Sequence, residues 1–164
     1  MSAPRRMRGT ASDLVVSVWR LLAEGREDEA RATMLRTWSV AVDALAGEQA
    51  VHVALRLLER LAPSTDDPEG WARLPDEIPV FRAGMLEGFA WTTERDVAEA
   101  LARKLRAEWS EAVPIHLGTV AKRHVLAYIT GYGEHELAVR WECVNVTKTL
   151  AGARTVPTPV PPQR

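Results

Sequence analysis

The chain changes character close to residue 77, and this change limits the folds open to it. Before that point, apolar residues at helical spacing predict three amphipathic helices, at about 12–23, 27–46 and 48–62. After it, short β-branched and aromatic segments predict six strands, at 80–82, 89–92, 115–120, 124–129, 134–140 and 144–146. One long helix, from residue 94 to about residue 110, interrupts them. This order predicts an α+β fold, with N-terminal helices packed on a small, mostly antiparallel β-sheet that carries one inserted helix.

Length and composition suggest one ordinary domain with four segments. Residues 1–11 form a basic leader that we expect to be disordered, residues 12–76 the helical portion, and residues 77–150 the α+β core. Residues 151–164 form a proline-rich tail, which we expect to be flexible and extended because repeated proline excludes a regular helix or strand. Prolines also indicate a loop at 63–68, followed by one helical turn at 69–74.

Charge and cysteine content exclude several classes of function. The net charge of −1 offers no global attraction for nucleic acid or an anionic membrane, and no apolar run approaches the roughly 20 residues of a membrane span. Cys143 is the only cysteine, which excludes an intrachain disulfide and a zinc cluster and favours a reducing, cytoplasmic setting. The four histidines lack the spacing of metal ligands, so we expect no metal site.

Two segments of the α+β core carry candidate site residues. In the first, Arg82 ends a strand, and Trp91, Thr92 and Thr93 precede the long helix. Thr93 followed by Asp96 resembles a capping box, so we expect Thr93 to cap that helix. An arginine and the start of a helix both attract anions, so this segment is a candidate binding site for an anion or a nucleotide.

The second segment is the strand at 134–140. Side chains alternate along a strand, so Glu134 and Glu136 share one face, roughly 6–7 Å apart, while His135 and Leu137 take the other. Two acids at this position are either a solvated edge or the acidic part of a site.

Taken in order, Arg82, the Trp91-Thr92-Thr93 segment and the Glu134-x-Glu136 strand resemble the ADP-ribosyltransferase superfamily of the arginine–serine–glutamate type. The resemblance covers residues 78 to about 146. It implies that Arg82 holds the phosphates of NAD⁺, that Thr92 and Thr93 steady the site, and that Trp91 stacks near the nicotinamide or belongs to the core.

The same resemblance implies that Glu136 is the catalytic carboxylate and that Glu134 activates the acceptor. In the family, the later glutamate binds the ribose and stabilises positive charge as nicotinamide leaves, and a glutamate at the earlier position favours an arginine acceptor. The chain departs from the family pattern in reading Trp-Thr-Thr rather than Ser-Thr-Ser, and in having a shorter sheet portion.

The function implied is an NAD-dependent mono-ADP-ribosyltransferase that modifies a macromolecular acceptor without a metal. Two alternatives stay open. One is a non-catalytic phage or prophage binding module that keeps this fold and uses its N-terminal helices to contact a protein partner. The other is a toxin-like effector of the bacterial cytoplasm that is held by an antitoxin.

Overall fold

A computed structural model describes residues 11–44, 48–131, 133 and 135–151, and these residues form five α-helices and one seven-stranded sheet. The sheet is mostly antiparallel, which confirms the predicted α+β fold. Almost all of the predicted leader and tail lies outside the described residues. No helix within the described part is both long and apolar enough to cross a membrane.

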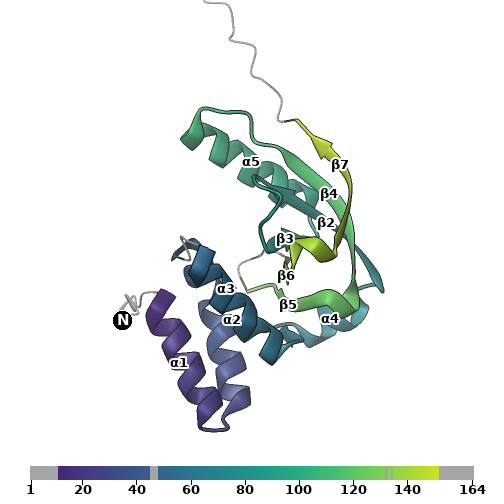
Figure 1. The fold of residues 1–164 in the computed structure, drawn as a ribbon. Coiled ribbons are helices and arrows are strands. Elements are labelled where there is room, and N and C mark those ends of the chain that lie inside the picture. Colours follow the sequence, from purple (N-terminus) through teal and green to yellow (C-terminus); the bar gives the residue numbers. More distant parts are fainter. Residues whose placement is uncertain (1–10, 45–47, 132, 134, 152–164) are drawn as a thin grey trace, which may run out of the picture.

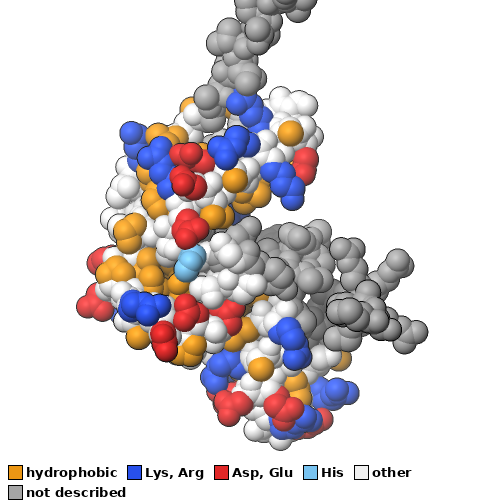
Figure 2. Space-filling view, turned by 180° about the vertical axis from the view of Figure 1, so that it is seen from behind, with side chains coloured by type: hydrophobic (Ala, Val, Ile, Leu, Met, Phe, Trp, Pro, Cys, Tyr) orange, Lys and Arg blue, Asp and Glu red, His pale blue; other side chains and the backbone are white. Residues whose placement is uncertain are grey.

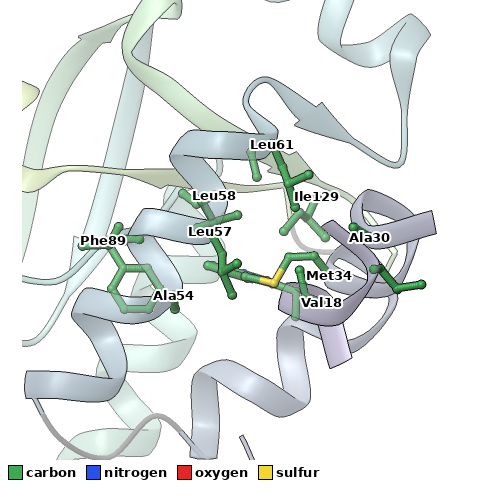
Figure 3. Packing of buried hydrophobic residues seen from close by; sticks show 14 residues of the cluster. Val18, Ala30, Met34, Ala54, Leu57, Leu58, Leu61, Phe89 and Ile129 are labelled. Carbon is green, nitrogen blue, oxygen red and sulfur yellow. The ribbon is translucent and has the colours of Figure 1, made fainter. Parts of the chain in front are cut away.

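The N-terminal helices are α1 (Ala11–Ala23), α2 (Glu27–Ala44) and α3 (Glu48–Leu61), close to the predicted ranges. Their apolar stripes meet in one core, where side chains from all three helices are buried together (Figure 3): Val18, Leu21, Ala30, Met34, Trp38, Ala54, Leu55, Leu57, Leu58 and Leu61. Because Phe89 and Ile129 from beyond residue 77 belong to the same core, the helices and the sheet share one hydrophobic interior.

The sheet runs in the order β1-β5-β6-β3-β2-β4-β7. Its strands are β1 (Ser64–Thr65), β2 (Glu77–Ala83), β3 (Ala90–Thr92), β4 (Ile115–Ala121), β5 (Val125–Ile129), β6 (Glu136–Val139) and β7 (Val144–Leu150). Short 3₁₀ turns, η1 (Lys122–His124) and η2 (Trp141–Cys143), precede β5 and β7. The strand expected from residue 124 therefore begins one residue later.

The segment 63–68, expected to be a loop, contains the edge strand β1, which pairs with β5 in parallel. Ser64 is buried and donates from Oγ to the Leu61 carbonyl, which turns the chain from α3 into the sheet. Asp66 then accepts hydrogen bonds from the backbone amides of Thr130 and Gly131 at 2.8 and 2.9 Å. These contacts with the end of β5 explain why the segment is ordered against the sheet.

Two further helices flank the sheet. The helix α4 (Pro68–Arg73) matches the predicted turn, and Asp67 caps it by accepting from the Gly70 amide at 2.9 Å. The inserted helix α5 (Arg95–Trp109) buries Ala98 and Ala102. In Figure 1, α5 and the N-terminal helices lie on the same side of the sheet, towards its two ends, whereas α4 lies apart from them.

One face of the sheet is covered by helices at both ends. Cross-strand pairing places a row of side chains on this face: Ile129, Glu136, Thr92 and Phe81. Ile129 packs in the core of α1–α3, and Ala83, two residues beyond Phe81, packs with Ala102 of α5. The middle of the row, Thr92 and Glu136, therefore lies between the two helical covers.

The opposite face carries a second hydrophobic core: Ile78, Val80, Trp91, Val120, Val125, Tyr128, Leu137, Val139 and Val144. Trp71 of α4 and Cys143 of η2 pack against this core, and Cys143 is a half-buried free thiol. On the outer surface, Figure 2 shows basic and acidic side chains interspersed, in keeping with the net charge of −1.

Candidate functional site

The three motif segments lie on three neighbouring strands, β6, β3 and β2. Thr92 of β3 pairs with Glu136 of β6 on one side and with Phe81 of β2 on the other. Arg82 follows Phe81 directly. Segments up to 54 residues apart in the sequence, from Arg82 to Glu136, are thus brought together by the sheet.

A cavity of about 380 Å³ opens between this part of the sheet and α5. Arg82, Thr92 and Glu136 all line it. The remaining lining is mostly apolar and comes from β2, the loop after it, β3 and α5: Phe81, Ala83, Gly84, Met85, Gly88, Phe89, Ala90, Trp91, Val97, Ala98, Leu101, Leu105 and Trp109. Three large apolar side chains of the lining are exposed: Met85, Leu101 and Trp109. The mouth of the cavity is therefore apolar, and the lining contains few polar groups.

Arg82 supports the loop between β2 and β3. Its Nε donates to the Met85 carbonyl at 2.6 Å, and its Nη1 donates to the Ala90 carbonyl. A Cβ at Gly88 would collide with the guanidinium, so a larger residue there would displace the head group of Arg82 from the loop. Arg82 therefore has a structural role in the loop, and two of its donors are engaged inside the chain.

The charge of Arg82 is partly withdrawn from water. Burial lowers its pKa, and attraction to Glu136 and Glu87 opposes this effect. An arginine remains protonated under these conditions because its reference pKa is above ~12. The cavity lining therefore includes a persistent positive charge from Arg82 and the carboxylate of Glu136, a combination suited to a ligand that carries both polar and charged groups.

Glu136 is half-buried at the start of β6 and accepts a hydrogen bond from a distant helix. Trp38 of α2 donates from Nε1 to its Oε1 at 2.6 Å. The sequence marks Trp38 only as one of the apolar residues at helical spacing in the helix expected at 27–46. The one available signal was chemical, because a buried tryptophan usually finds a partner for its indole N–H.

The two threonines make different contacts. Thr92 is buried, and its Oγ1 accepts from the Glu94 amide at 3.0 Å. The expectation that Thr93 caps the inserted helix is wrong: the N-cap is Glu94, without a side-chain capping bond, and α5 begins at Arg95. Thr93 instead donates its amide to the His135 carbonyl at 3.0 Å, which prolongs the pairing of β3 with β6 and delays the start of the helix.

Trp91 is a core residue, one of the two alternatives that the sequence left open. Its side chain is 1% exposed and belongs to the core on the opposite face, where Nε1 donates to the Gly88 carbonyl at 3.1 Å. Like Arg82, it therefore steadies the loop beside the cavity. Glu134, the expected acceptor-activating residue, lies outside the described residues.

A second polar group lies on the opposite face of β6. The Tyr128 hydroxyl and His135 Nδ1 are 2.6 Å apart, and His135 Nε2 lies 3.5 Å from Glu94 Oε1. Burial raises the pKa of Tyr128, and nearby acids, with Asp67 first among them, add to this effect. The group links the end of β5 to the start of α5 and lies on the other face of the sheet from Glu136.

Replacing Tyr128 with phenylalanine should weaken the fall in the free energy of unfolding with rising pH above about pH 8. The unfolded chain releases the phenol proton near pH ~10, whereas the folded chain retains it to higher pH, so stability is fully present below that point and falls above it. Free energies of unfolding measured at about pH 8 and about pH 10.5 should differ less in Tyr128→Phe than in the wild type. Equal differences in the two proteins would show that Tyr128 does not contribute to this dependence.

No group of three or more His, Cys, Asp or Glu side chains in the described part of the chain is arranged to hold a metal ion. Of the histidines, His116 is buried and bonds through Nε2 to the Gly84 carbonyl, at the turn after β2. No family model, curated protein or solved structure matches the chain.

Proposed function

We propose that the protein is an NAD-dependent mono-ADP-ribosyltransferase that uses the cavity beside α5. The observation that carries this proposal is that Arg82, Thr92 and Glu136, chosen from the sequence by their order along the chain, line a single cavity. Their strands are direct neighbours, Thr92 pairs directly with Glu136, and Arg82 lines the same cavity as this hydroxyl and carboxylate. Catalysis requires positioned groups of this kind.

The proposed reaction breaks the bond between the ribose C1′ and the nicotinamide nitrogen of NAD⁺. The bonding electrons leave with nicotinamide, positive charge builds on the ribose, and a nucleophile of the acceptor forms the new bond to C1′ and releases its proton. A carboxylate placed near the sugar stabilises the positive charge, as in glycoside hydrolysis. We assign this role to Glu136 and the activation of the acceptor to Glu134.

The cavity is large enough for part of the substrate. Sites for small molecules occupy roughly 300–1,000 Å³, and about 380 Å³ at the low end of this range suits the nicotinamide and its ribose. The apolar wall from α5 fits a flat aromatic ring and excludes water from the reacting bond, while the persistent charge of Arg82 suits the adjoining phosphate.

The second candidate function is a binding module without turnover. It is favoured by one observation, namely that Arg82 already donates to two backbone carbonyls in the β2–β3 loop. In this case the apolar cavity holds a ligand or a partner's side chain, and Glu136 with Arg82 forms its polar end.

The cellular setting is part of the proposal. A single free thiol at Cys143 and no disulfide among the described residues suit a reducing cytoplasm. A bacterial or phage-encoded effector that is held by an antitoxin is compatible with the same chemistry. Severe growth arrest on expression, relieved by Glu136→Gln, would support the effector role, and harmless expression would argue against it.

Calorimetric titration with NAD⁺ separates the two candidate functions. We expect saturable heat with one site per chain, and competition by nicotinamide, because the cavity accepts the nicotinamide end of the substrate. A folded protein that gives no heat at millimolar NAD⁺ would contradict the proposed transferase and favour the binding module.

A further inference from the structure

The N-terminal helices contribute directly to the candidate site. Trp38 of α2 lies 98 residues before Glu136 in the sequence, and its Nε1 donates to Glu136 Oε1 at 2.6 Å. The family resemblance covers residues 78 to about 146 and therefore says nothing of this contact. A hydrogen bond to a charged acceptor is stronger than one between neutral groups, so the contact restrains the carboxylate strongly.

The indole is itself held in place. Trp38 is 1% exposed, and its ring meets the Phe89 ring edge to face, with the centroids 5.6 Å apart and an angle of 72°. Phe89 in turn lines the cavity. Rotation of the indole away from Glu136 would break this packing inside the core, so the N–H is aimed at the carboxylate by its surroundings.

The helix α2, which carries Trp38, packs with α1 and α3 in a core that is continuous with the sheet. Their buried side chains form one cluster with Ile129 of β5 and Ala138 of β6, and not a separate core of their own. Trp38 is also not among the residues that line the cavity, so it does not fill the space a substrate would use. The contact therefore orients Glu136 and does not block it.

We propose that Trp38 is a positioning residue for the Glu136 carboxylate. By fixing one carboxylate oxygen from outside the cavity, the indole sets the direction in which the carboxylate faces the ribose. This role rests on the proposed transferase function. It also gives the N-terminal helices a part in the chemistry, in addition to packing on the sheet.

The first test detects the contact without any need for activity. In the ¹⁵N-labelled full chain, the six tryptophans give indole N–H signals, and the signal missing from Trp38→Phe identifies Trp38. In Glu136→Gln this signal should move upfield, because a neutral acceptor replaces a charged one. A Trp38 signal unmoved by Glu136→Gln would overturn the proposal, since the indole would then not be bonded to that carboxylate.

The second test measures nicotinamide release from NAD⁺. Trp38→Phe keeps an aromatic ring against Phe89 and removes the donor, so we expect kcat to fall roughly 10- to 100-fold, the factor for one bond to a charged group, with KM within about twofold. The control is Trp19→Phe on the exposed side of α1, which should retain wild-type kcat and KM.

The outcomes distinguish failure of the positioning role from failure of the proposed function. Release by the wild type with an unchanged kcat in Trp38→Phe would overturn the positioning role and leave the proposed function standing. No release by the wild type, with the indole signal still moved by Glu136→Gln, would refute the transferase and reduce the Trp38 contact to a structural one. If Trp38→Phe does not fold, nuclear Overhauser contacts between the indole and the Phe89 ring assign the Trp38 signal instead, and the Glu136→Gln spectrum still decides whether the contact exists.

Discussion

Replacing Arg82 with methionine should lower the free energy of unfolding by about 3 kcal/mol. Methionine replaces the aliphatic stem of the side chain but leaves the carbonyls of Met85 and Ala90 without their donor inside the β2–β3 loop. It also removes the positive charge that offsets Glu136 and Glu87. For a chain of this size, the loss corresponds to a fall in Tm of roughly 6–12 °C.

Denaturant unfolding of the two proteins measures this difference, and Arg95→Met is the matched control. Arg95 pairs with Glu99 on the exposed side of α5 at 2.8 Å, and such surface pairs contribute at most about 1 kcal/mol. If Arg82→Met is as stable as Arg95→Met, the guanidinium does not hold the loop. In that case the role of the guanidinium is confined to the cavity, and the result would favour phosphate binding by Arg82.

Replacing Glu136 with glutamine should reduce nicotinamide release by about 10²- to 10³-fold. Glutamine has the same shape and can still accept from Trp38, so the fold and the cavity are kept while the negative charge facing the ribose is lost. Binding of NAD⁺ should change much less than turnover, because the carboxylate acts mainly on charge that develops in the transition state.

The control for this variant is Glu142→Gln in η2, an exposed carboxylate outside the cavity, which should release nicotinamide at the wild-type rate. Thermal unfolding of both variants checks that their folds are equally intact. Equal rates for Glu136→Gln and wild type would remove Glu136 from the mechanism, whatever the cavity binds.

The helices and strands could be predicted because their signals are local. Met34 and Trp38 of α2 recur at helical spacing, and both are buried as expected. Leu137 and Val139 alternate with Glu136, and both are buried on the face opposite to it. Patterns of this kind depend only on residues a few positions apart, so one sequence is enough to reveal them.

The parts of the site that were missed depend on distant contacts. The two-residue strand β1 is held by Asp66, whose partners lie 64 and 65 residues away. The bond from Trp38 to Glu136 joins the first and last thirds of the chain. The start of α5 is set by a carbonyl of the β6 entrance and not by the threonine beside it. No local pattern contains this information.

We propose that this cavity cleaves NAD⁺, and the most direct measurement is nicotinamide release by the wild-type chain. The purified full-length protein is incubated with millimolar NAD⁺ and an arginine-containing peptide, and free nicotinamide is followed by chromatography beside Glu136→Gln. We predict steady release by the wild type, transfer of ADP-ribose to the peptide, and near-background release by the variant. A folded wild type that releases no more nicotinamide than Glu136→Gln would contradict the account.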